Sequence, residues 1–122
     1  SRPIGALFHV PHGLSNAMLL PEITAWSVHH APQRYAHCAR HMGMAQAGDG
    51  DCVALDKLVD GLRQLNADLA VPSPRSYGID EQVWNTSLAT MAEQALASGS
   101  PANNPRVPTA QEIIALYGKV YS

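Results

Sequence analysis

Histidine is the residue type of this chain best suited to chemistry, and one of its six histidines stands in an unusual setting. His12 lies between Pro11 and Gly13, directly before an apolar stretch that has the length of a helix. Because proline fixes φ and glycine adopts backbone angles closed to other residues, a side chain flanked by both is held in one direction. A neutral imidazole held in this way is a good metal ligand. The alternative is a histidine that only caps or packs at the start of a helix.

The other histidines give weaker indications of a site. His9 lies three residues before His12, but the proline between them disfavours one continuous helix, so we expect His9 on a pocket wall or on the surface. His37 and His41 have the i, i+4 spacing that can chelate a metal on a helix, yet no further ligand completes the set. We therefore expect these two on a solvated polar face.

The segment around His12 resembles the metal-site segment of the iron-containing (group III) alcohol dehydrogenases. The family pattern runs through Pro-His-Gly, Asn-Ala and an apolar run ending in proline, and here it occupies residues 11–13, 16–17 and 18–21. Weaker matches follow in the family's order. They are Arg-Tyr-Ala at 34–36, Met-Gly at 42–43, Asn-Pro-Arg at 104–106, and Glu-Ile at 112–113 before Tyr117. The resemblance therefore covers nearly the whole chain.

The resemblance implies a divalent metal site to which His12 contributes one ligand. Family members hold the metal, Fe²⁺ or Zn²⁺, with one aspartate and three histidines, and His12 matches the third histidine. The other three ligands fall before Ser1. The chain thus supplies one donor, whereas metal sites in proteins need three or four. We expect the chain alone to bind a metal poorly or not at all.

Three further residues are candidates through the same resemblance. At the position of Arg2, many family members carry a histidine near the nicotinamide and substrate that is credited with a catalytic proton transfer. A guanidinium stays charged near neutral pH and cannot do this, although it can pair with a phosphate or a substrate carboxylate. The alternative is a surface arginine. Ser100 and Pro101 are expected to approach the substrate. Arg106, which is not a site candidate, is expected to fix its loop by bonding carbonyls or a carboxylate.

The function implied is that of the C-terminal domain of a metal-dependent alcohol dehydrogenase, which interconverts an alcohol and an aldehyde or ketone with NAD(P). The implied partners are an N-terminal nucleotide-binding domain outside this chain, a small alcohol or carbonyl substrate, and further copies in a homo-oligomer. Two alternatives remain open. One is a metal-independent relative similar to maleylacetate reductases, whose anionic substrate Arg2 would suit. The other is a non-catalytic helical interaction module with a structural His12. The chain alone is expected to be inactive.

Composition limits the partners. The chain has 46% hydrophobic and only 15% charged residues, which suggests that another domain or subunit covers part of its surface. A formal net charge of −2 without a basic block argues against nucleic acid, and no apolar run is long enough to span a membrane. No secretory signal is present, so a cytoplasmic location is expected. Cys38 and Cys52 are interpreted as reduced thiols, one of them buried, rather than as a disulfide.

Hydrophobic periodicity predicts a single all-α domain over residues 1–122, built as a bundle of about five helices. These helices are expected at about 12–28, 32–43, 51–69, 80–97 and 109–120. Pro21 should kink the first helix because it lacks an amide hydrogen. Asp80 is a candidate N-cap, Asp51 is another, and Thr109 with Glu112 has the spacing of a capping box. Residues 98–108 are expected to be irregular.

Overall fold

The computed structural model describes residues 1–122 as an all-α fold without a strand, which confirms the predicted fold class. None of its helices is both long and apolar enough to span a bilayer. The α-helices are α1 (Arg2–Phe8), α2 (His12–Ser27), α3 (Pro32–His41), α4 (Asp51–Asp68), α5 (Pro74–Tyr77), α6 (Glu81–Ala97) and α7 (Ala110–Tyr121). Two 3₁₀-helices, η1 (Val28–His30) and η2 (Ser100–Asn103), complete the secondary structure.

The five predicted helices correspond to α2, α3, α4, α6 and α7, whereas α1 and α5 were missed. Helix α1 has only seven residues and contains a proline and a glycine, so it shows no helical period. It ends at His9, whose backbone is left-handed with φ 56° and ψ 30°. His9 and His12 therefore do not share one continuous helix, as expected. Helix η2 gives order to part of the segment that was predicted to be irregular.

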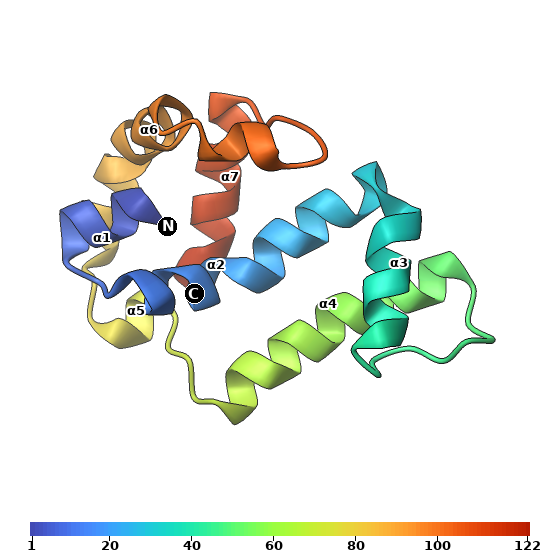
Figure 1. Ribbon diagram of the computed structural model, residues 1–122. Helices are drawn as coiled ribbons and strands as arrows, with labels where there is room; N and C mark the ends of the chain where they lie inside the picture. The colour runs from blue at the N-terminus through green and yellow to red at the C-terminus, as the bar shows by residue number, and fades with distance from the viewer.

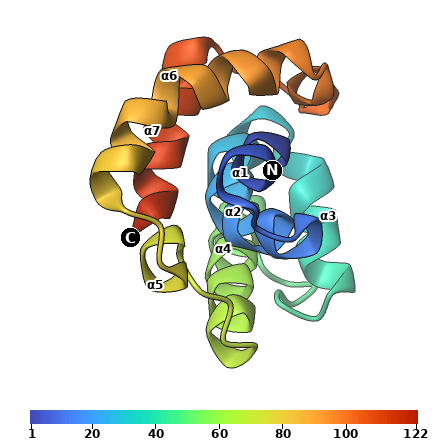
Figure 2. The ribbon, with the colours of Figure 1, turned by 90° about the vertical axis from the view of Figure 1, so that its left-hand side faces the viewer.

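Helix α2 runs through the middle of the molecule, between two pairs of helices (Figure 1). Helices α6 and α7 pack against each other on one side, and α3 packs against α4 on the other. Figure 2 shows the same division after a quarter turn, with the α6–α7 pair beside α2. Helix α1 contacts both α2 and α6. Because α2 contacts α4 as well as α7, it joins the two halves.

Each half has its own hydrophobic core. We call the first the aromatic cluster; it comprises Ile4, Val10, Met18, Leu19, Ile79, Trp84, Met91, Ala92, Ile113, Tyr117, Val120 and Tyr121. We call the second the aliphatic cluster; it comprises Val28, Ala36, Ala39, Ala45, Ala54, Leu55, Leu58, Val59 and Leu62. The centre of the aromatic cluster is Trp84, which is fully buried and whose Nε1 donates to the carbonyl oxygen of Tyr117 at 3.2 Å.

Helix α2 continues through Pro21 rather than ending there. Proline has no amide hydrogen, so the carbonyl of Ala17, four residues earlier, has no donor within the helix. Nδ2 of Asn66, on α4, donates to this carbonyl at 2.8 Å. Arg63 of the same helix forms an ion pair with Glu22 of α2 at 3.2 Å. Helix α4 thus supplies from outside the hydrogen bond that Pro21 removes.

The predicted caps are correct at two helices and wrong at a third. Asp80 Oδ1 accepts from the amide of Val83, and Thr109 forms the predicted capping box with Glu112. Gly50, not Asp51, is the N-cap of α4, and the Asp51 carboxylate instead pairs with Arg40 at 2.9 Å. An ion pair to the neighbouring helix α3 therefore replaces the expected cap.

The prediction of one buried cysteine is also wrong, because Cys38 and Cys52 are both exposed and unpaired. On α3, Ala36 and Ala39 face the aliphatic cluster, and Cys38 lies between them in sequence on another face. Cys52 precedes the first buried residue of α4, Ala54, by two positions. The buried positions on α3 are taken by alanine, and those on α4 by alanine, leucine and valine.

Candidate functional site

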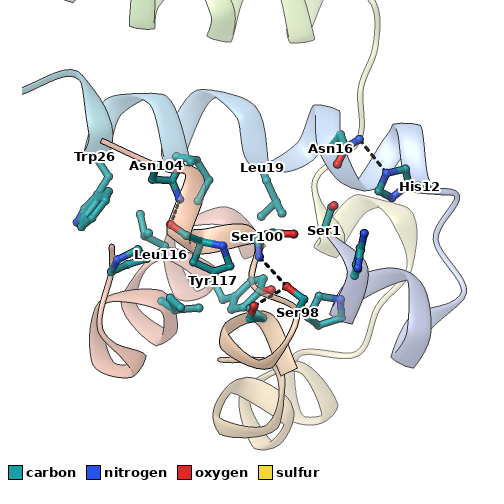
Figure 3. A pocket seen from close by; sticks show the side chains of 17 residues that line it. Ser1, His12, Asn16, Leu19, Trp26, Ser98, Ser100, Asn104, Leu116 and Tyr117 are labelled. Carbon is teal, nitrogen blue, oxygen red and sulfur yellow. Dashed lines mark hydrogen bonds between the residues drawn. The ribbon is translucent and has the colours of Figure 1, made fainter. Parts of the chain in front are cut away.

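A cavity of about 410 Å³ lies against α2, and its other walls come from the start of α1, the end of α6 with η2, and α7 (Figure 3). Five α2 side chains line it at intervals of three or four residues, so they form one face of the helix. They are His12, Asn16, Leu19, Ile23 and Trp26. The mixture of apolar walls and a few polar groups suits a small ligand.

All four residues singled out from the sequence line this one cavity. Arg2 comes from the first turn of α1, His12 from the first turn of α2, and Ser100 and Pro101 from η2. Helix η2 is far from the starts of α1 and α2 in the sequence, and the fold brings all three to a common space. Arg2, His12 and Ser100 are exposed, whereas Pro101 is half-buried.

His12 is directed towards the cavity by the start of α2, whose N-cap is Pro11 with φ −52° and ψ 142°. Its Nε2 lies 3.4 Å from Nδ2 of Asn16, one turn further along the helix (Figure 3). The amide can only donate, so Nε2 accepts in this contact, and 3.4 Å is long for a hydrogen bond. The Asn16 side chain thus contacts this ring. The Nε2 lone pair is therefore engaged only in a long, weak hydrogen bond.

The side chains that commonly ligate metals in proteins are those of histidine, cysteine, aspartate and glutamate. His12 is the only residue of these types that lines the cavity. Nowhere in the chain do three such side chains gather closely enough to hold an ion. The ring fits the part of a metal ligand, since it is exposed, it borders the cavity and its Nε2 is weakly engaged. A complete site needs further donors.

Hydrogen bonds within the segment hold the η2 wall in place. Ser98 Oγ donates to the carbonyl of Ala95 at 2.6 Å and accepts from the amide of Ser100 at 3.3 Å. Asn104 Nδ2 donates to the carbonyl of Pro101 at 3.1 Å. These polar groups are thus engaged with their own loop (Figure 3).

Arg106 anchors the end of the same loop. Of the two expected kinds of partner, backbone carbonyls or a carboxylate, it bonds a carboxylate. Its Nη2 lies 2.8 Å from Oε1 of Glu112, and its guanidinium lies 5.2 Å from the centre of the Trp26 ring. The pKa of Glu112 is lowered mainly by the hydrogen bond from the Thr109 amide, with a smaller contribution from Arg106. The loop is therefore tied both to α7 and to the α2 wall.

Tyr117 lines the cavity from α7, and the sequence did not indicate it as a site residue. It is 4% exposed, and desolvation by burial raises its pKa to about 12. The other missed residues, Leu19, Ile23 and Trp26, could have been found from the sequence. They follow His12 and Asn16 at spacings of three and four, which places them on the same helical face.

The remaining histidines do not belong to this cavity. His9 is exposed and does not line it. His37 and His41 lie on α3 with their Nε2 atoms 3.0 Å apart, and both are exposed. Only His12 combines exposure with a position on the cavity wall.

Residues 1–121 match the family described as "Fe-containing alcohol dehydrogenase family, C-terminal". The chain is 32% identical over 126 residues to the bifunctional aldehyde-alcohol dehydrogenase AdhE of Escherichia coli K12. That alignment covers 90% of this chain and 14% of the length of AdhE. It is 31% identical to the 1,3-propanediol dehydrogenase of Klebsiella pneumoniae, in an alignment that covers 97% of this chain and 30% of that protein.

The fold matches a crystal structure of 1,3-propanediol oxidoreductase with a TM-score of 0.88 and 30% sequence identity. That match covers 98% of this chain and 31% of the other. The chain therefore spans less than a third of the length of each of these relatives.

Proposed function

Since this chain belongs to the C-terminal family of the iron-containing alcohol dehydrogenases, we propose that it forms the metal-side wall of an alcohol dehydrogenase active site. The enzyme would interconvert an alcohol and an aldehyde or ketone with NAD(P). One observation carries the proposal: His12, on α2, lines the same cavity as Arg2, Ser100 and Pro101. In an interaction module, His12 would instead pack inside the bundle, whereas it is exposed here.

We propose His12 as one ligand of a divalent ion, Fe²⁺ or Zn²⁺, whose other donors lie outside this chain. A bound ion of this kind supplies Lewis-acid polarisation of the alcohol oxygen. His12 would offer Nε2, so the weak contact from Asn16 would give way. Asn16 would then be free to donate to an oxygen of the substrate.

The cavity walls have a second task, which is to exclude water from the carbon that loses or gains hydride. Leu19, Ile23 and Leu116 provide apolar surface there. Ser100 and Pro101 would contact the part of the substrate that lies away from His12. Tyr117 keeps its proton at neutral pH because its pKa is about 12, so it presents a neutral phenol to the cavity.

The remaining components belong to the whole enzyme. We propose that NAD(P) is held by an N-terminal nucleotide-binding domain, which would close the cavity from the side of α1 and α2. A small alcohol or carbonyl compound is the substrate, and the enzyme is a cytoplasmic homo-oligomer.

The test is alcohol-dependent reduction of NAD(P)⁺ by a full-length protein that carries this chain. His12→Ala should lower kcat/KM by roughly 100-fold or more, because loss of a metal ligand removes the group that polarises the alcohol. His37→Ala is the matched control, since it removes another exposed imidazole, one that does not line the cavity. Turnover that survives His12→Ala unchanged contradicts the proposal.

A further inference from the structure

The cavity is long and narrow. His12 and Trp26, the first and last of the α2 side chains that line it, are 14 residues apart, which corresponds to about 21 Å along the helix axis. In Figure 3 they lie at opposite ends of the row of lining side chains, with Leu19 between them. A volume of about 410 Å³ distributed over that length leaves room for an extended molecule and little room for a branched one.

The two ends of this cavity differ in polarity. On α2, the polar side chains His12 and Asn16 come first, and every later residue of the wall is apolar or aromatic, namely Leu19, Ile23 and Trp26. Helix α7 and the proline just before it add further apolar surface. A ligand that suits both ends has a polar head group near His12 and a hydrocarbon tail directed toward Trp26.

The polar groups in the middle of the wall do not require a polar ligand. Oγ of Ser98 donates to the carbonyl of Ala95, and Nδ2 of Asn104 donates to the carbonyl of Pro101. Because both side chains are bonded within their own segment, an alkyl chain that lies beside them breaks neither hydrogen bond.

Trp26 is held firmly at its end of the cavity. The guanidinium of Arg106 lies 5.2 Å from the centre of the indole, and the centre of the His30 ring lies 5.2 Å from it as well. Arg106 is fixed in turn by Glu112, at 2.8 Å, which belongs to the capping box of α7. All of these contacts are internal to this chain, so the chain itself builds this end wall.

We propose that Trp26 is a specificity-determining residue that limits the length of an unbranched alkyl chain on the substrate. This inference rests on the proposed function and names its substrate class, a straight-chain primary alcohol or aldehyde of medium length. The hydroxyl faces His12, the chain follows the face of α2 formed by Leu19 and Ile23, and its end meets the indole. Each buried methylene strengthens binding until the chain reaches Trp26.

The experiment measures reduction of NAD(P)⁺ with a series of straight-chain primary alcohols by a full-length protein that carries this chain. The series is ethanol, 1-butanol, 1-hexanol, 1-octanol and 1-decanol. With the unmodified enzyme, kcat/KM should rise roughly threefold to fourfold for each added methylene, mostly through KM. It should then fall at the length at which the chain meets the indole.

Two variants move the end wall in opposite directions. Trp26→Ala should shift the best substrate to a longer alcohol, because loss of the indole lengthens the cavity. Ile23→Trp should shift it to a shorter alcohol, because the new indole stands about one turn closer to His12. Both shifts are measured as the ratio of kcat/KM for long and short alcohols, which a general loss of activity does not change.

Tyr77→Ala is the matched control, because Tyr77 is an exposed aromatic residue that does not line the cavity. It should leave the order of the alcohols unchanged. Circular dichroism establishes that each variant is folded, and Ile23→Trp decides alone if Trp26→Ala is not.

Two results overturn this inference and leave the proposed function standing. One is turnover of ethanol with no rise in kcat/KM for longer alcohols in the unmodified enzyme. The other is an equal loss for every alcohol in folded Trp26→Ala or Ile23→Trp, with the best substrate unchanged, since the indole would then only stabilise the fold. Absence of turnover with any alcohol refutes the proposed function as well.

Discussion

The two hydrophobic clusters of this molecule differ in their relation to the cavity. Three members of the aromatic cluster, Leu19, Ile113 and Tyr117, also line the cavity, whereas no member of the aliphatic cluster does. The aliphatic cluster consists of alanine, valine and leucine, and two ion pairs, Arg40 with Asp51 and Lys57 with Asp49, lie beside it. The half that contains the aromatic cluster therefore forms walls of the cavity. The half that contains the aliphatic cluster forms none of them and packs against α2 through α4.

The difference shows why α2 is the decisive element. It presents His12 and four further side chains to the cavity, and its opposite side is bonded to α4 through Asn66 and Arg63. A change in the aromatic cluster should disturb both stability and the cavity. A change in the aliphatic cluster should affect stability and leave the cavity walls in place.

The largest expected effect comes from Trp84→Ala. Truncating this fully buried side chain should cost about 3–5 kcal/mol in the free energy of unfolding, measured with urea, and leave the Tyr117 carbonyl without its donor. Leu58→Ala is the counterpart in the aliphatic cluster, with an expected cost of about 2–4 kcal/mol. Amide NMR shifts at Ser98 and Tyr117 should change in Trp84→Ala and stay fixed in Leu58→Ala. Equal shifts in both variants would contradict the division.

A smaller effect is expected from Asn66→Ala, which removes one of the two side-chain bonds between α4 and α2 and leaves the ion pair of Arg63 with Glu22. The carbonyl of Ala17 then has no protein donor, and the free energy of unfolding should fall by about 1–2 kcal/mol. Gln64→Ala is the control, because Gln64 bonds only to Asp68 within α4. If the two variants have the same free energy of unfolding, the bond from Asn66 does not compensate for the hydrogen bond that Pro21 removes from α2.

Helix capping also separates the two halves. Helices α6 and α7 begin with side-chain caps, whereas α3 and α4 begin at Ala31 and Gly50 without them. Thr109→Ala should lower the free energy of unfolding by about 1 kcal/mol, since it breaks the capping box of α7. Thr86→Ala, an exposed change inside α6, should have almost no effect on thermal unfolding. If Thr109→Ala leaves the free energy of unfolding unchanged, packing alone fixes the start of α7.

The smallest effect at neutral pH is expected from Tyr117→Phe, which becomes informative at alkaline pH. Burial raises the Tyr117 pKa to about 12 in the folded chain, against about 10 when unfolded. The unfolded chain therefore loses this proton first, and stability falls as pH rises from about 10 to 12. Tyr117→Phe should reduce that fall in urea unfolding curves measured across this range. The same alkaline slope in both proteins would exclude Tyr117 as its source.

The sequence predicted the long helices well because their apolar residues recur at three and four positions. It could not predict α1, whose proline and glycine hide a seven-residue helix, or α5, which is a single turn. The bond from Asn66 to Ala17 joins residues 49 positions apart, and no local pattern indicates it. Exposure of Cys38 and Cys52 likewise depends on which helical face meets its neighbour.

The candidate site shows the same limit. Its four predicted residues line one cavity, but Tyr117 was not predicted as a lining residue, since periodicity separates buried from exposed faces and does not reveal cavities. Arg2 and Ser100 lie 98 positions apart in the sequence, and only the packing of α1 against α2 and α6 brings them to the same space.

The most direct test of the account is the metal content of a full-length protein that carries this chain, measured by inductively coupled plasma mass spectrometry. Unmodified protein and His37→Ala should retain the same iron or zinc per polypeptide, and His12→Ala should lose most of it. Circular dichroism of all three proteins establishes that the helices are intact. Undiminished metal in folded His12→Ala would contradict the assignment of His12 as a ligand.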